Sequence, residues 1–135
     1  MNCDKRICLW SGPRNISTAL MYSFAQRSDT IVFDEPLYAY YLKHHPEAHG
    51  YHPGTQDILN TMENDGGKVV EMMLNNNERP VVFFKHMTHH LLGLDREFMK
   101  HTVNVILTRN PKDMLPSFDK VISNPTIDDV GYGLH

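Results

Sequence analysis

The chain has 135 residues, a length that corresponds to one domain with a modest hydrophobic core. Apolar residues make up 41% of it, charged residues make up 21%, and the formal net charge is −3. This balance excludes a generally basic nucleic-acid-binding or membrane-surface protein, so an anionic ligand would need a local cationic site. We expect neither a nucleic-acid partner nor a membrane partner.

Short apolar runs alternate with helical patterns along the chain. Strands are predicted at residues 6–10, 30–33, 80–85 and 101–108. Helices are predicted at residues 19–25, 37–42, 55–74 with a break at Gly66 and Gly67, 91–100 and 111–122. This alternation implies βαβ units, and therefore an α/β fold with a central parallel sheet. Residues 121–135 contain neither a closing strand nor a closing helix, so we expect a single domain over 1–135 that is incomplete at its C-terminus.

The amino-terminal residues and the two cysteines favour a cytoplasmic location. Cys3 and Cys8 are so close in sequence that a disulfide would close a very small loop, and reduced thiols are the simpler interpretation. Residues 1–6 are polar, and the apolar stretch that follows is too short for a signal peptide or a membrane anchor.

The first predicted strand runs into a turn of the phosphate-binding type. Residues 9–18 read LWSGPRNIST, which has the length of such a loop but lacks its Gly-Lys pair. Free backbone N–H groups and the positive end of a helix at this kind of turn bind anions. Ser17 and Thr18 open the predicted helix, and the planar guanidinium of Arg14 suits phosphate or sulfate oxygens. An ordinary capped turn with a solvated Arg14 explains this motif equally well.

A second turn of this kind follows the last predicted strand. Residues 105–113 read VILTRNPKD, and Ser117 lies eight residues after Arg109. Arg109 at the strand end and Ser117 two turns into the helix are spaced to hold one phosphate from both sides. Because parallel strands end at the same edge of a sheet, the two turns predict the two halves of one anion site.

The second turn resembles the signature of cytosolic sulfotransferases that use 3′-phosphoadenosine 5′-phosphosulfate (PAPS). These enzymes read Arg-Asn-Pro-Lys-Asp followed by a serine at the same spacing. In that family the arginine and serine bind the 3′-phosphate, which implies this role for Arg109 and Ser117. The family's Pro-Lys-Ser-Gly-Thr-Thr loop, which binds the 5′-phosphosulfate, is similar to residues 13–18. The implied contacts on this loop are Arg14, Asn15, Ser17 and Thr18.

Other segments resemble a divergent group of sulfotransferase-like P-loop proteins, in which some plant members are labelled branched-chain aminotransferase-like. The likeness rests on residues 10–25, 34–38 and 85–87 and covers nearly the whole chain. It implies a three-layer P-loop fold of the sulfotransferase type, of which this chain corresponds to about the N-terminal half. No lysine stands in a recognisable cofactor-aldehyde context, so aminotransferase chemistry finds no support in the sequence.

Sulfuryl transfer needs a base for the acceptor's proton and a cation near the leaving phosphate. Sulfotransferases carry the base in a Lys-x-His pattern after the corresponding strand, where this chain reads Lys85-His86-Met87. Met87 stands in the family's histidine place, so the candidates for the base are His86 or, after a small shift of the turn, His89. Lys85 and Arg14 are the cations that would neutralise the leaving group.

Two further groups of side chains follow the predicted strands. His86, His89 and His90 have the spacing of metal ligands on a helix, but no nearby cysteine or carboxylate completes a set, so no metal is expected. Asp34 and Glu35 end the second strand, where they bind an acceptor hydroxyl, orient Arg14 or simply form a turn.

The resemblance predicts transfer of a sulfuryl group from PAPS to a hydroxyl or amine of a small-molecule acceptor, with no required metal. The alternative is a non-catalytic nucleotide-binding or regulatory protein, which keeps the phosphate turns without the closing half of the domain. A phosphoryl-transfer enzyme that uses ATP is a third reading, which the absent Gly-Lys-Ser/Thr sequence disfavours. The sequence indicates neither the acceptor nor the oligomeric state.

Overall fold

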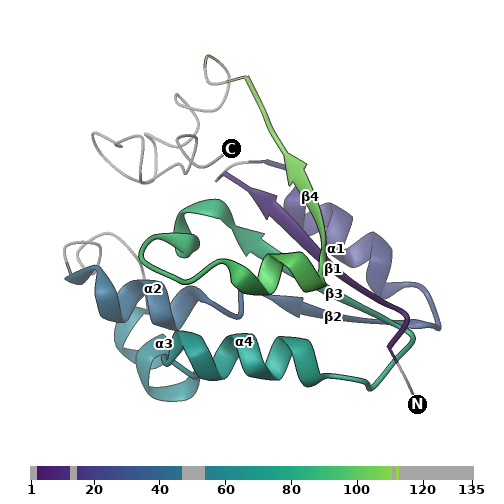
Figure 1. The fold of residues 1–135 in the computed structure, drawn as a ribbon. Coiled ribbons are helices and arrows are strands. Elements are labelled where there is room, and N and C mark those ends of the chain that lie inside the picture. The colour runs from purple at the N-terminus through teal and green to yellow at the C-terminus, as the bar shows by residue number, and fades with distance from the viewer. Residues whose placement is uncertain (1–2, 13–14, 47–53, 111, 113–135) are drawn as a thin grey trace.

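The computed structural model describes residues 3–12, 15–46, 54–110 and 112. Its centre is a four-stranded parallel sheet with the strand order β2-β3-β1-β4 (Figure 1). The strands are β1 (Lys5–Ser11), β2 (Thr30–Asp34), β3 (Val81–Met87) and β4 (Val103–Leu107). All of them run in one direction, so their carboxyl ends share one edge of the sheet, here called the carboxyl edge. The opposite edge is called the amino edge.

Helices cover both faces of the sheet and give it three layers (Figure 1). Helix α1 (Ser17–Ala25) connects β1 to β2 and packs on the face called here the α1 face. On the other face, called the α4 face, lies α4 (Gly66–Asn75). The other helical segments are α2 (Tyr38–His44), α3 (Thr55–Thr61) and the 3₁₀ helices η2 (Thr88–Leu91) and η3 (Glu97–His101). The predicted α/β fold with a central parallel sheet is confirmed.

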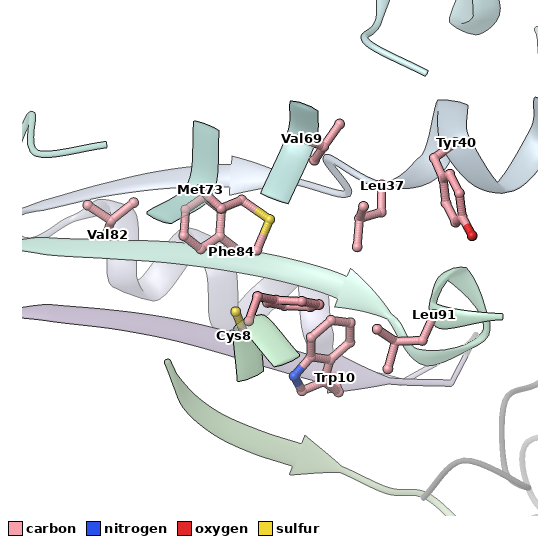
Figure 2. Close-up of a cluster of buried hydrophobic side chains, with 10 residues drawn as sticks. Cys8, Trp10, Leu37, Tyr40, Val69, Met73, Val82, Phe84 and Leu91 are labelled. Atoms are coloured by element: carbon pink, nitrogen blue, oxygen red, sulfur yellow. The ribbon is translucent and has the colours of Figure 1, made fainter. Parts of the chain in front are cut away.

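The larger hydrophobic core lies between the sheet and α4 (Figure 2). Alternate residues of a strand share one face, which places Cys8 and Trp10 of β1 and Phe84 of β3 on this side. The members with almost no exposed surface are Cys8, Trp10, Leu37, Val69, Met73, Val82 and Phe84. Burial raises the pKa of the Cys8 thiol to about 12, so it stays protonated. Cys3 and Cys8 are both free thiols, as predicted.

The α1 face has a smaller core. Leu9 of β1, Phe83 of β3 and Met21 of α1 are buried against one another. The ring of Phe24 stacks on Phe83 at a centroid distance of 4.4 Å. This contact sets the distance between α1 and the sheet, and therefore the position of the turn that leads into α1.

The guanidinium of Arg6 closes the C-terminal end of α4 near the amino edge. Its Nε donates to the carbonyl oxygen of Met73 at 3.1 Å. Its Nη2 donates to the carbonyl oxygen of Asn76 at 3.1 Å and to Oδ1 of Asn77 at 2.8 Å. Carbonyls at a helix C-terminus lack partners within the helix and form its negative end, so a cation there satisfies both.

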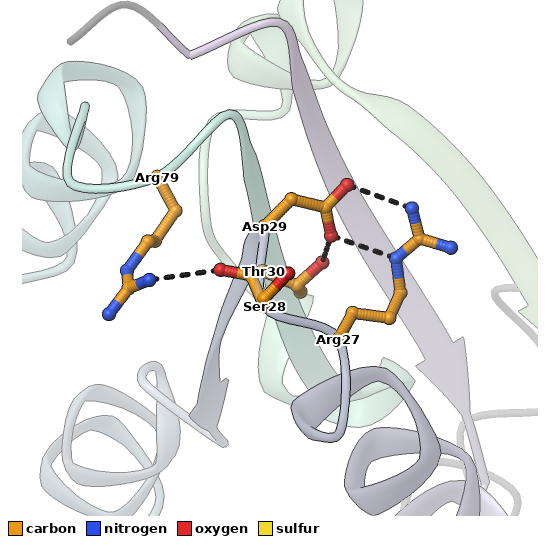
Figure 3. A network of polar contacts seen from close by, with 5 residues as sticks. All are labelled: Arg27, Ser28, Asp29, Thr30 and Arg79. Atoms are coloured by element: carbon orange, nitrogen blue, oxygen red, sulfur yellow. Dashed lines mark hydrogen bonds and ion pairs between the residues drawn. The ribbon is translucent and has the colours of Figure 1, made fainter.

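A second group of polar contacts holds the turn before β2, also at the amino edge (Figure 3). Nε and Nη2 of Arg27 donate to the two carboxylate oxygens of Asp29 at 2.9 and 2.8 Å. Asp29 also accepts a hydrogen bond from the hydroxyl of Thr30 at 2.8 Å, and these contacts lower the pKa of Asp29 to about 2. Arg79 donates to the carbonyl of Ser28 at 2.9 Å and so joins this turn to the segment before β3.

The predicted break at Gly66 and Gly67 is wrong in position. Helix α3 ends at Thr61, and Gly66 and Gly67 form the first turn of α4. The carboxylate of Asp65 caps this helix by accepting from the backbone N–H of Lys68 at 3.1 Å. The Asp65 cap therefore fixes where the helix begins, and it outweighs the low helix propensity of the two glycines.

The predicted helix at residues 91–100 is also wrong, because η2 and η3 occupy this part of the chain. Gly93 lies between them with φ 78°, a left-handed conformation that ends a helix and that glycine adopts at little cost. The predicted helix at residues 111–122 lies outside the described residues apart from Lys112.

Candidate functional site

The two turns singled out in the sequence meet at the carboxyl edge. Nδ2 of Asn15, on the first turn, donates to the carbonyl oxygen of Leu107 at the end of β4, at 3.2 Å. A cavity of about 310 Å³ opens beside this contact and takes its lining from both turns: Asn15, Ile16, Leu107, Thr108 and Arg109. The structure thus brings together Asn15 and Arg109 of the predicted site. Arg14 and Ser117 lie outside the described residues.

Helix α1 begins at the wall of this cavity. Ile16 lines the cavity and precedes the first helical residue, and no side chain caps the helix. Ser17 and Thr18 lie at the start of the helix as expected, but they are its first two residues rather than its N-cap, which is Ile16; Ser17 is buried and Thr18 is exposed. The first N–H groups of a helix have no partner within it, and together with the helix dipole they make this end attractive to an anion.

Two buried polar atoms stand without a partner next to the first turn. Among the described residues, nothing forms a hydrogen bond with the hydroxyl of Ser11 or with Oδ1 of Asn15. Ser11 has no exposed surface and ends β1, one residue before Gly12. Buried polar groups in folded proteins are almost always hydrogen-bonded, so these two atoms mark the first turn as a place prepared for a further partner.

Lys85 lies near the carboxyl end of β3 and is held by two carboxylates. Its Nζ is 3.0 Å from Oδ1 of Asp34 and 3.4 Å from Oε2 of Glu35. The side chain of Lys85 is 7% exposed, whereas those of Asp34 and Glu35 are 50% and 25% exposed. A buried ammonium needs such partners, because the loss of hydration would otherwise favour its neutral form.

Glu35 has an unusual backbone conformation. Its φ of 49° is the one positive value among the non-glycine residues that the structure describes, and its N–H donates to the carbonyl of Lys85 at 2.8 Å. Burial raises the pKa of the Glu35 carboxyl, and the charge of Lys85 partly offsets this effect. Burial and the charge of Glu35 also raise the pKa of the neighbouring Tyr38 to about 12. The strand end thus holds Glu35 against Lys85 through both backbone and side chain.

His86, the predicted base, points to the other face of the sheet from Lys85. Its ring has no exposed surface and stacks on Trp10 at a centroid distance of 4.1 Å. Neither ring nitrogen has a hydrogen-bond partner among the described residues. Burial lowers the pKa of His86 to about 3, so the ring is neutral at physiological pH. Its role as base stays a prediction, and in this conformation the ring does not reach the cavity between the turns.

His89 and His90 belong to an aromatic cluster beside α2. Both are buried in η2, where His90 stacks on Tyr38 at 5.1 Å and His89 meets the edge of Tyr41 at 4.8 Å. Within the part of the chain that the structure describes, no three histidine, cysteine, aspartate or glutamate side chains group together around a position for a metal ion.

Ser11 and the ion pairs of Lys85 were not among the residues and contacts predicted from the sequence. The signal for Ser11 was available, because it is the one hydroxyl in a strand whose other late residues, from Cys8 to Trp10, are apolar and buried. The ion pairs depend on β2 and β3 being neighbours, which no local pattern specifies.

Of the described residues, no helix is long and apolar enough to cross a membrane.

Comparison with known proteins identifies the family. A model of the sulfotransferase domain matches residues 5–134. Branched-chain-amino-acid aminotransferase-like protein 1 of Arabidopsis thaliana is 44% identical over 127 residues, which are 92% of this chain and 22% of that protein. Branched-chain-amino-acid aminotransferase-like protein 2 of the same plant is 46% identical over 114 residues, 83% of this chain and 20% of that protein.

The chain spans about a fifth of the length of these curated relatives. No solved structure is significantly similar to it. The resemblance to the divergent group that contains the plant aminotransferase-like proteins is confirmed. The chain belongs to the sulfotransferase domain family.

Proposed function

We propose that this chain binds PAPS and transfers its sulfuryl group to a hydroxyl or amine of a small-molecule acceptor. The observation that carries the proposal is the cavity at the carboxyl edge, to which both turns contribute and which has a helix N-terminus at its wall. Its size and the guanidinium of Arg109 in its lining suit an anionic group such as a phosphate or a phosphosulfate. Membership of the sulfotransferase domain family supports the same ligand.

The two turns would hold the two ends of the nucleotide. Arg14, Asn15, Ser17 and Thr18 would bind the 5′-phosphosulfate through side chains and through the N–H groups at the start of α1. Arg109 and Ser117 would bind the 3′-phosphate, with the guanidinium of Arg109 making charge-assisted hydrogen bonds. The hydroxyl of Ser11 has no partner among the described residues and supports an additional donor on the side of the first turn.

In the transfer step the acceptor oxygen or nitrogen attacks sulfur, and the bond between sulfur and the bridging phosphate oxygen breaks. The acceptor's proton passes to a base, for which His86, or His89 as the alternative, is proposed. The electron pair of the broken bond stays on the phosphate of the leaving nucleotide, where Lys85 and Arg14 would neutralise the new charge. The scheme requires no metal.

A second candidate is a non-catalytic nucleotide-binding protein. One observation favours it: His86 has no exposed surface from which to take a proton. Both candidates share the nucleotide site, and they differ only in turnover. The relatives' aminotransferase-like name belongs to proteins much longer than the matched segment and is not carried over to this chain.

Calorimetric titration of the chain with 3′-phosphoadenosine 5′-phosphate (PAP) and, separately, with ATP tests the shared site. We expect binding of PAP in preference to ATP, and a loss of at least about tenfold in Arg109→Ala, the size of one charged hydrogen bond. Arg79→Ala is the matched control, since Arg79 is an exposed arginine at the amino edge. Absence of PAP binding by the folded chain would refute the proposal. Turnover of PAPS with a panel of hydroxyl and amine acceptors then separates the two candidates.

A further inference from the structure

The position of Lys85 follows from the register of the sheet. Lys85 pairs with Leu9 of β1 and with Asp34 of β2, and paired residues of parallel strands point to the same face. Lys85 therefore lies on the α1 face, two residues beyond Phe83 toward the carboxyl edge. The α4 face, which carries His86, lies on the other side of the sheet.

The start of α1 also lies on the α1 face, displaced toward the carboxyl edge from the small core on that face. Met21 of α1 packs against Leu9 and Phe83, and Ser17 precedes Met21 by one helical turn on the same face of the helix. Since α1 runs back from the carboxyl edge, Ser17 is displaced from this contact toward that edge, and Lys85 is displaced in the same direction along β3. Both side chains are buried. Lys85 and Ser17 thus lie on the same face of the sheet and are both displaced toward the edge at which the 5′-phosphosulfate is proposed to bind.

Two carboxylates nevertheless occupy the ammonium group of Lys85. The contact with Glu35, at 3.4 Å, is long for a charged hydrogen bond, and Asp34 is half-exposed. Because the contact with Glu35 is long, it contributes less than a short charged hydrogen bond, and a phosphate group can replace Glu35 as the partner of Lys85 at a smaller cost. The lysine, in contrast, is nearly enclosed and must keep an anionic partner.

We infer that Glu35 is a positioning residue that holds Lys85 in place at the carboxyl edge and competes with the 5′-phosphate group of the nucleotide for it. Before the nucleotide binds, Glu35 and Asp34 satisfy the buried ammonium. When the nucleotide binds, its phosphate takes over part of this role and Glu35 is released toward solvent. This inference rests on the proposed function, because it requires the nucleotide to bind at the first turn.

A pH dependence follows from this competition. The groups that face Glu35 are Lys85 of β3, Asp34 of β2 and Tyr38 of α2. Of these, Lys85 favours the charged carboxylate, whereas Asp34 and burial disfavour it, and the net result raises the pKa of Glu35. As the pH falls through this pKa, Glu35 loses its charge and its hold on Lys85, and the competition disappears.

The test compares PAP affinity of the wild-type chain and of Glu35→Gln by calorimetry. At pH 8 we expect Glu35→Gln to bind PAP about three- to tenfold more tightly, the effect of one partly buried charge pair. The ratio of the two affinities should approach one as the pH falls through the raised pKa of Glu35. A ratio cancels the titration of the ligand's own phosphates. Glu97→Gln is the matched control, because it removes the same charge from an exposed glutamate paired with Lys100, and it should leave PAP affinity unchanged.

A second variant shows whether the effect passes through Lys85. In a Lys85→Met background PAP should bind more weakly, and adding Glu35→Gln should then bring no further gain. If Lys85→Met does not fold, the pH series on the wild-type chain and Glu35→Gln decides alone. Equal or weaker PAP binding by Glu35→Gln at pH 8 would overturn this inference and leave the nucleotide site standing. Absence of PAP binding by every variant would overturn the proposed function, and this inference with it.

Discussion

The two edges of the sheet differ in how completely their polar groups are paired. At the amino edge, Arg27 and Asp29 are exposed and paired with each other, and Arg6 satisfies the carbonyls at the end of α4. At the carboxyl edge, the hydroxyl of Ser11 and both nitrogens of His86 are buried without a partner among the described residues. Contacts at the amino edge therefore stabilise the fold. The unpartnered groups at the carboxyl edge lower the stability of the fold, and the hydroxyl of Ser11 lies next to the turn at which a ligand is proposed to bind.

The substitution with the largest expected effect is Trp10→Ala, which removes the side chain that packs the carboxyl edge from inside. Trp10 is buried, stacks on His86 and donates from Nε1 to Oδ1 of Asn104 at 2.9 Å. Its loss should lower the free energy of unfolding by about 3–5 kcal/mol, as for other large aromatic truncations in a core. Urea unfolding followed by circular dichroism measures it. A loss below about 1 kcal/mol would show that this part of the core is not closely packed.

His86→Leu tests whether the buried, neutral ring of His86 makes the stability of the fold depend on pH. The folded-state pKa of His86, about 3, lies below its ordinary value of 6.5, so the fold prefers the neutral ring. The stability that this preference gives to the fold is fully present above pH 6.5. It is lost as the pH falls from 6.5 toward 3, and the free energy of unfolding then decreases by at most about 1.4 kcal/mol per pH unit.

Wild-type unfolding free energies at pH 7 and pH 5 should therefore differ by more than those of His86→Leu. Equal pH dependence in the two proteins would mean that His86 is solvated or hydrogen-bonded in solution. A loss of PAPS turnover in His86→Leu with unchanged PAP affinity would support its role as base.

Arg6→Ala addresses the amino edge. The variant loses three hydrogen bonds to Met73, Asn76 and Asn77, which should lower the free energy of unfolding by about 1–2 kcal/mol. PAP affinity should not change, because these contacts are remote from the carboxyl edge. A marked change in PAP affinity at unchanged secondary structure would contradict the division of roles between the two edges.

The smallest expected effect is that of Asp29→Asn. The side chains of Asp29 and Arg27 are exposed, so water replaces much of what their ion pair contributes. Thermal unfolding at low and high salt should give nearly the same midpoint for the variant and the wild type. A large loss at low salt that disappears at high salt would show that this turn depends on its charges.

Local patterns predicted the elements well and their contacts poorly. The four strands and α1 follow from apolar runs and from the turn at residues 12–18, because these signals are short-range. The start of α4 and the loss of the helix at 91–100 depend on the Asp65 cap and on the left-handed Gly93, which outweigh helical periodicity. The strand order β2-β3-β1-β4 is a long-range property, and only this order brings Lys85 to Asp34 and Glu35.

Part of the candidate site was predictable, because it depends on short sequence motifs. Asn15 and Arg109 were assigned from motifs, and their meeting at one cavity follows from the shared carboxyl edge of parallel strands. Neighbouring residues of a strand point to opposite faces of the sheet, and this alternation separates Lys85 from His86. Lys85 and His86, adjacent in sequence, were assigned to one site, yet they lie on opposite faces of the sheet.

The most direct test of the contrast between the edges is a titration of the ¹⁵N-labelled chain with PAP, followed by backbone amide shifts in two-dimensional NMR spectra. Amide shifts should concentrate at the carboxyl edge, on Asn15, Ser17, Thr108 and Arg109. The amide chemical shifts of Arg27, Asp29 and Arg79 at the amino edge should not change. Shifts centred on the amino edge, or spread evenly over both edges, would contradict the account.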